Sequence, residues 1–194
     1  MKLIKIVGFL SALLILFAGC ESDNTESVAQ LPQTMIDGTG VLQISYPDGW
    51  LATPEQGRIN IANNQDVLAN NGSDLVEGQI WGTVFFMGQT DLDRYELTTA
   101  ATPREVLDGF IDSSTVDVDI NARDEYTFGS YDAIVSRGRV DRNGIFAGAI
   151  YTVIKVNDGF ILFIFSTLPD ETEQFYAQVR QISTTLVYTP PTDE

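Results

Sequence analysis

The sequence predicts an α+β protein: an antiparallel sheet of about six or seven strands, packed with one middle helix and one C-terminal helix. Three observations support this prediction. Short segments alternate apolar and polar residues between turn residues, as half-buried strands do. Two turn sequences, at 141–144 and 157–159, divide the second half of the chain into hairpins. Two further segments place apolar residues at helical spacing behind capping signals.

Strand signals dominate the first half of the chain. Residues 41–47 (VLQISYP) alternate apolar side chains on one face, and residues 58–63 (RINIAN) do the same, so we expect these two segments to pair as a hairpin. A short helix is expected between residues 63 and 72, where an Asn-Asn-Gly sequence favours its termination. Residues 79–88 form a longer predicted strand.

The middle helix has the clearest start signal in the chain. Thr102 is a capping residue, Pro103 suits the first helical position, and Glu105 completes a capping box. The helix then places four apolar residues on one face: Val106, Leu107, Phe110 and Ile111.

The second half of the chain predicts consecutive antiparallel strands and a final helix. Residues 131–140 and 145–156 flank an Asn-Gly turn, which is a strong hairpin signal. Residues 160–165 (FILFIF) are apolar on both faces, as a covered central strand should be. Residues 168–186 predict a helix whose apolar stripe is Phe175, Val179, Ile182 and Leu186.

The charge balance restricts the classes of partner. The 194 residues include 27 acidic and 11 basic side chains and no histidine. Removing residues 1–19 takes away Lys2 and Lys5 and leaves a net charge of −18. Nucleic-acid binding depends on basic side chains that neutralise phosphates, so no nucleic-acid partner is expected. Electrostatic attraction to anionic lipid is disfavoured for the same reason.

The N-terminus predicts a targeting segment. Two lysines precede residues 6–18, an uncharged run shorter than the roughly 20 residues that span a bilayer. The run ends in Phe17-Ala18-Gly19-Cys20, which resembles the lipobox of bacterial lipoproteins, with Phe17 in place of the usual leucine. The resemblance implies cleavage before Cys20 and lipid attachment to its thiol, so the protein is expected in a bacterial cell envelope, membrane-anchored and facing outward.

These features divide the chain into four predicted parts. We expect a lipoprotein signal peptide at 1–19, a flexible tether at 20–38, a single α+β domain at 39–188 and a disordered tail at 189–194.

The order of elements also resembles a known fold family. Tyr46-Pro47-Asp48-Gly49-Trp50 follows the first strand, and an Ile-x-Ile-Ala-Asn strand, an inserted helix, a three-stranded meander and a C-terminal helix follow it. This arrangement, over residues 39–188, resembles the Mog1/PsbP-like domains. The resemblance implies accessory, assembly or binding modules that are mostly not enzymes. Metal retention in PsbP proteins partly involves histidine, which is absent here, so no metal site is inferred.

Few reactive groups remain for catalysis. Without histidine, and with Cys20 acylated, the domain cannot form Ser-His-Asp or Cys-His triads or histidine-based zinc sites. We therefore predict no catalytic residue, no metal and no cofactor, and a domain that is not an enzyme. A hydrolase that uses two carboxylates is the enzymatic alternative.

Three groups of residues are candidates for binding. Arg137 and Arg139 alternate onto one strand face and suit a carboxylate or phosphate ligand, although pairing with neighbouring acids is the simpler interpretation. Residues 117–125 begin like a calcium loop but lack its glycine and its final glutamate, which favours a solvated connecting loop. Trp50 and Trp81 suit either a binding surface or the core.

Taken with the lipobox, these patterns predict a lipid-anchored extracytoplasmic accessory or binding module with a protein partner or a role in envelope assembly. A lipoprotein that binds a small ligand or a cation is the alternative.

Overall fold

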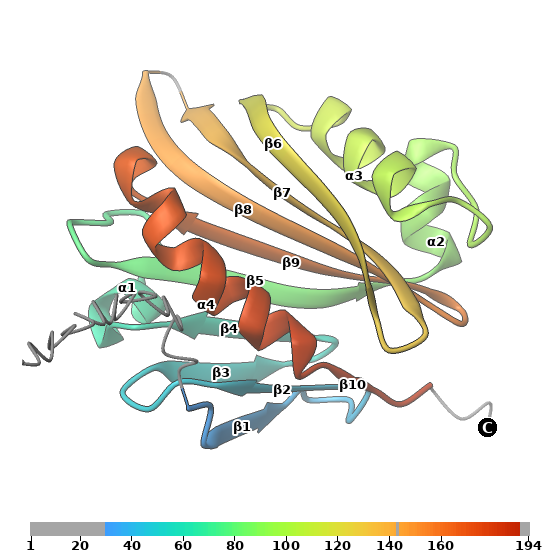
Figure 1. Ribbon diagram of the computed structural model, residues 1–194, viewed down its shortest axis with the longest axis horizontal. Helices are drawn as coiled ribbons and strands as arrows, with labels where there is room; N and C mark the ends of the chain where they lie inside the picture. The colour runs from blue at the N-terminus through green and yellow to red at the C-terminus, as the bar shows by residue number, and fades with distance from the viewer. Residues whose placement is uncertain (1–29, 143, 191–194) are drawn as a thin grey trace, which may run out of the picture.

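The computed structural model describes residues 30–142 and 144–190, which form two antiparallel sheets and four α-helices (Figure 1). In spatial order the large sheet contains β3 (Leu51–Glu55), β4 (Arg58–Ala62), β5 (Ile80–Met87), β9 (Gly159–Thr167), β8 (Ile145–Val156), β7 (Tyr131–Arg142) and β6 (Asp117–Phe128). The small sheet contains β1 (Gln33–Ile36), β2 (Leu42–Tyr46) and β10 (Val187–Tyr188). The helices are α1 (Gln65–Ala69), α2 (Gln89–Leu92), α3 (Pro103–Asp112) and α4 (Thr172–Thr184). The predicted α+β class is confirmed.

The large sheet is covered on both faces, and the central strand β9 shows why. Phe163 and Phe165 of β9 are buried on the face covered by α4 and the small sheet, whereas Phe160 and Leu162 are buried on the face covered by α3. Burying each such side chain contributes about 1.5–3 kcal/mol. The strand therefore needs a cover on each face, as its doubly apolar sequence predicts.

Helix α4 and strand β2 share the cover of one face. The helix contributes three buried residues of its predicted stripe, namely Phe175, Val179 and Ile182. Leu42, Ile44 and Tyr46 are the inward-facing residues of β2, and they belong to the same core cluster. One face of the large sheet is thus covered partly by a helix and partly by a second sheet, which the sequence did not predict.

Local signals predicted the starts of α3 and α1, whereas α4 begins at Thr172 without a side-chain cap. In α3 the Glu105 amide donates to Thr102 Oγ1 (3.2 Å), and the Thr102 amide donates to Glu105 Oε2 (2.8 Å), which completes the predicted capping box. In α1 the side chain of Asn64 caps the first turn, and Val67 and Leu68 are buried as expected.

The predicted pairing of residues 41–47 with residues 58–63 is wrong. β2 pairs with β1 and β10, and β4 pairs with β3, which is the preceding segment in the chain. Pro54 in β3 obscured that strand, but β3 lies at the edge of the large sheet, where a proline costs no ladder hydrogen bond.

The ordered domain also starts earlier than predicted, because β1 lies within the range 20–38 that was assigned to a tether. Both ends of the described chain meet on β2, since β1 and β10 flank it and the Thr189 amide donates to the Val41 carbonyl (2.9 Å). No helix among the described residues is long and apolar enough to cross a membrane.

Asp37, in the turn between β1 and β2, connects the small sheet to the large one. Its buried carboxylate accepts hydrogen bonds from the amides of Thr39 (2.9 Å), Leu42 (2.7 Å) and Gly57 (3.1 Å). Gly57 lies in the β3–β4 turn, so the carboxylate joins turns of both sheets. Burial opposes ionisation of Asp37, but a hydrogen bond from the Thr39 hydroxyl, together with the three amide hydrogen bonds, outweighs it and lowers the pKa of the carboxyl group.

We predict that Asp37→Asn lowers the free energy of unfolding at pH 7 by about 1–3 kcal/mol, because an amide group cannot satisfy all of these buried donors. Since the folded pKa is lowered, the contribution of Asp37 is present above its unfolded pKa and is lost as the pH falls through the folded value. Urea unfolding at neutral and acidic pH measures both effects, with the exposed turn residue Asp48→Asn as the control. Equal stability of the Asp37→Asn variant and the unmodified protein at pH 7 would contradict this role.

Candidate functional site

The two predicted ligand-binding arginines lie on the same face of β7, but their surroundings differ. Arg137 forms ion pairs with Glu173 of α4 (2.5 Å) and Asp124 of β6 (3.6 Å). Its guanidinium carbon also lies 4.2 Å from the ring centroid of Tyr176, and the side chain is only 18% exposed. Arg137 thus pairs with neighbouring acids, which was the simpler of the two interpretations of the sequence. Its positive charge is neutralised within the fold.

Arg139 is exposed and lies at the open end of the same strand. Its guanidinium carbon is 4.9 Å from the ring centroid of Phe146 on β8. On the other side of β7, strand β6 has a β-bulge, since the register changes between Ile120 and Ala122. Gly138 permits the close approach, because a Cβ atom there would lie 2.3 Å from the Asp119 carbonyl oxygen. The structure therefore leaves Arg139, rather than the pair, available to an outside group.

The predicted connecting loop at 117–125 is wrong, because these residues belong to strand β6. Side chains two positions apart on an extended strand are separated by about 7 Å, so alternating carboxylates cannot wrap around an ion as a calcium loop does. Two ionic contacts instead connect this strand to α3: Arg123 pairs with Asp108 (2.6 Å) and Arg104 pairs with Glu125 (2.7 Å). Within the described part of the chain, no three acidic, cysteine or histidine side chains are grouped to hold a metal.

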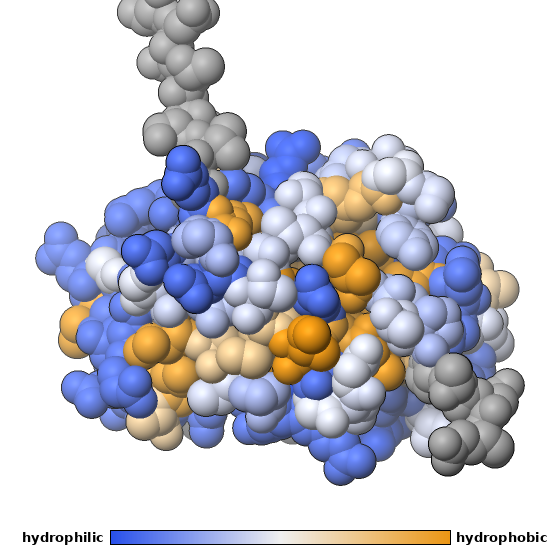
Figure 2. All heavy atoms as spheres, turned by 90° about the horizontal axis from the view of Figure 1, so that it is seen from below, coloured by the Kyte–Doolittle hydropathy of each residue, from blue (hydrophilic) through white to orange (hydrophobic). Residues whose placement is uncertain are grey.

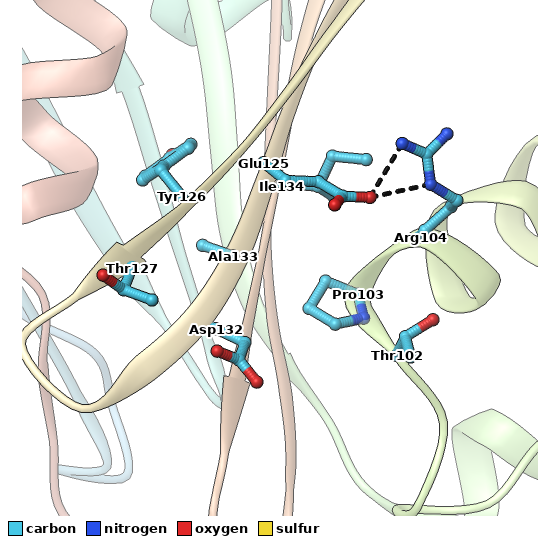
Figure 3. Close-up of a pocket in the computed structure, with 9 residues that line it drawn as sticks. All are labelled: Thr102, Pro103, Arg104, Glu125, Tyr126, Thr127, Asp132, Ala133 and Ile134. Atoms are coloured by element: carbon cyan, nitrogen blue, oxygen red, sulfur yellow. Dashed lines mark hydrogen bonds and ion pairs between the residues drawn. The ribbon is translucent and has the colours of Figure 1, made fainter.

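A cleft of about 520 Å³ opens between the start of α3 and the β6–β7 hairpin (Figure 3). It is lined by Thr102, Pro103, Arg104, Glu125, Tyr126, Thr127, Asp132, Ala133 and Ile134. Arg104 and Glu125 face each other from opposite sides and are joined by two contacts of 2.7 and 2.8 Å. The Tyr126 side chain points away from the cleft toward α4, where burial raises the pKa of its hydroxyl to about 12. The cleft is suited to holding an apolar group beside an internally neutralised ion pair.

The β7–β8 hairpin ends in two exposed apolar side chains, at the start of the segment that was predicted as a strand over residues 145–156. Ile145 is 73% exposed and Phe146 is 49% exposed. They are consecutive strand residues and therefore point to opposite faces of the hairpin. Turn-proximal positions are usually polar, so two large apolar residues directly after an Asn-Gly turn are the signal that could have identified this feature.

A hollow of about 270 Å³ lies beside Ile145, between the hairpin and the loop that precedes β5. Its lining includes Leu75 from that loop, Val140 from β7 and Leu168 after β9. We refer to Arg139, Ile145 and Phe146 as the hairpin tip. It combines an arginine, an aromatic residue and an aliphatic residue next to a partly apolar hollow.

The remaining predicted residues fall into two groups. Trp50 and Trp81 are half-buried and pack against core clusters, in agreement with the core interpretation. Cys20 lies outside the described residues, so its lipidation stays a prediction.

Comparison with solved structures confirms a PsbP-like fold. The cyanobacterial PsbP protein (CyanoP) of Synechocystis aligns with a TM-score of 0.52 at 14% identity, over 81% of this chain and 92% of that one. LpqN of Mycobacterium tuberculosis, described as involved in cell envelope biogenesis, aligns with a TM-score of 0.50 at 15% identity, over 81% of this chain and 90% of that one. A scan of protein-family models and a search of curated proteins both gave no match. At these identities the similarity establishes the fold alone.

Proposed function

We propose that this protein is a lipid-anchored accessory module of a bacterial envelope, and that it holds a protein partner with its hairpin tip. The lipobox-like sequence ending at Cys20 supports the anchor. The observation that carries the binding role is the exposure of Ile145 and Phe146 at the end of a regular hairpin. The lack of histidine and of a second cysteine supports binding rather than catalysis.

The composition of the hairpin tip suits a protein interface. Binding hot spots are enriched in aromatic residues and arginine, and a few such side chains carry most of the binding energy. Fully burying an exposed side chain of this size contributes at most about 1.5–3 kcal/mol, and Ile145, which is 73% exposed, has more surface left to bury than Phe146. The neighbouring hollow of about 270 Å³ has room for an apolar side chain of the partner in return. Arg139 adds a charged donor for a partner carboxylate.

Binding of a small ligand is the second candidate function. The cleft of about 520 Å³ at the start of α3 favours it, because Pro103, Ala133 and Ile134 give that cleft an apolar lining. In this alternative the hairpin tip is dispensable for function.

We predict that Cys20→Ser leaves an uncleaved precursor without lipid, since thioether formation requires the thiol. Mass spectrometry of the purified full-length protein measures the loss of the acyl chains and the retention of residues 1–19. Normal cleavage and acylation of the Cys20→Ser variant would contradict the anchor.

We predict that replacing the two apolar residues of the hairpin tip (Ile145→Ala with Phe146→Ala) reduces recovery of a bound protein about tenfold or more, because hot-spot truncations cost about 2 kcal/mol or more. Quantitative affinity capture of the anchored protein from its own membranes measures this. The thermal midpoint should fall only slightly, since Ile145 is 73% exposed and Phe146, which contacts Arg139, is half-exposed.

Val76→Ala is the matched control, because Val76 is a 57% exposed apolar residue outside the hairpin tip. Unchanged recovery of the same proteins by the hairpin variant would contradict the proposed function and favour the cleft.

A further inference from the structure

The outward face of the small sheet is uncharged. Strands β1 (QTMI), β2 (LQISY) and β10 (VY) contain no Asp, Glu, Lys or Arg, although charged residues make up 20% of the chain. Residues 38–47 and 181–190, which include and flank these strands, are also free of charge, and Asp37 is buried. Figure 2 views the molecule from this side: orange and pale residues cross the middle of the face, and most of the strongly hydrophilic ones lie toward its margins.

Two exposed apolar side chains lie in one row across this face. Ile36 of β1 and Val187 of β10 are both paired in register with Gln43 of β2, so all three share the outward face. Ile36 is 50% exposed and Val187 is 49% exposed. The charged groups that reach the small sheet do so at its edges, where Asp48 accepts a hydrogen bond from Gln33 and Asp158 accepts one from Tyr188.

Strand β1 of the small sheet is the first element in the described part of the chain. Only residues 21–32 separate Cys20 from β1. Such a segment reaches at most roughly 40 Å when fully extended. Its root-mean-square length as a flexible chain is about 20 Å. The uncharged face therefore remains within a short reach of the lipid attachment point.

We infer that the uncharged face of the small sheet lies against the bilayer that carries the anchor; this inference rests on the proposed lipidation of Cys20. The mature protein has a net charge of −18, so its other faces are repelled by anionic headgroups at close range. The small-sheet face avoids this repulsion and places Ile36 and Val187 at the interface. A tether holds the face at a high effective concentration near the bilayer, so a weak contact is sufficient to set the orientation.

A stable interface with a second copy or another protein needs more area than this face offers. The three strands have four, five and two residues, and at a strand spacing of about 4.8 Å and a rise of about 3.3 Å per residue they cover roughly 170 Å². A standard protein–protein interface buries about 800 Å² on each partner. The size of the face therefore favours the bilayer as its occupant.

This orientation points the hairpin tip away from the bilayer. In Figure 1 the small sheet lies at the bottom of the molecule, and the end of the hairpin that joins β7 to β8 lies at the top left. In this orientation the small sheet faces the lipid, and the hairpin tip projects away from the membrane, toward a protein partner.

The test uses the full-length lipidated protein in vesicles of phosphatidylethanolamine and phosphatidylglycerol that contain a lipid spin-labelled at its headgroup. Thr34→Cys places a fluorescent label on the outward face of the small sheet, and Ser73→Cys places the same label beside the hairpin tip. Because Cys20 carries the lipid, the introduced thiol is the reactive one. We expect the label at position 34 to be quenched at least about threefold more than the label at position 73.

A charged pair, Ile36→Asp with Val187→Asp, should remove this difference in quenching, whereas the matched control Val76→Asp should leave it intact. Equal quenching at positions 34 and 73, or stronger quenching at position 73, overturns the orientation even if the charged pair prevents folding. Self-quenching between labels at position 34 that depends on protein density would indicate a second copy and also overturns it. Protein that does not sediment with the vesicles refutes the anchor itself, and the orientation with it.

Discussion

The alternation of side chains along β2 is the constraint on which the rest of the structure depends. Leu42, Ile44 and Tyr46 point inward and complete the cover of the large sheet beside α4. Gln43 and Ser45 therefore point outward, into a face that nothing in the described fold covers. Because strand side chains alternate with a period of two, a shift of one residue would expose the core and bury the polar row. The register of β2 thus determines both the core and the uncharged face.

The same strand brings the two ends of the domain together. β1 and β10 come from opposite ends of the described chain and pair with β2 on its two edges. The segment that leads to the proposed anchor therefore enters the fold at the small sheet. The strands that carry the hairpin tip belong to the large sheet, and their connecting turn lies on the opposite side (Figure 1). The topology therefore places the side proposed to be anchored and the hairpin tip proposed to bind a partner at opposite ends of the domain.

Features that depend on neighbouring residues were predictable from the sequence, and features that depend on distant contacts were not. The capping box of Thr102 and Glu105 forms within one turn, and the Asn-Gly hairpin forms across a few residues, so both could be predicted. The partners of β2 could not, because β10 lies more than 140 residues further along the chain and β1 shows no strong alternation. The acidic residues of β6 made this segment resemble a solvated loop in the sequence. It is a strand, and its apolar residues Val118 and Ile120 pack against the core cluster that contains the buried residues of α3.

The candidate site likewise combines features that the local sequence predicts with features that depend on distant contacts. The shared face of Arg137 and Arg139 followed from strand alternation. Which arginine stays available depends on α4, whose Glu173 neutralises Arg137. The exposure of Ile145 and Phe146 depends on how far the covering elements extend over the hairpin, and its local signal is their position directly after the Asn-Gly turn.

The central claim is that the domain has a lipid-facing side and a partner-facing side, and photo-crosslinking in intact cells tests it most directly. A photoreactive phenylalanine analogue is introduced at Thr34 in one protein and at Phe146 in another, and the adducts are identified by mass spectrometry. The account predicts lipid adducts at position 34 and a specific protein adduct at position 146. Protein adducts at position 34 together with lipid adducts at position 146 would contradict it.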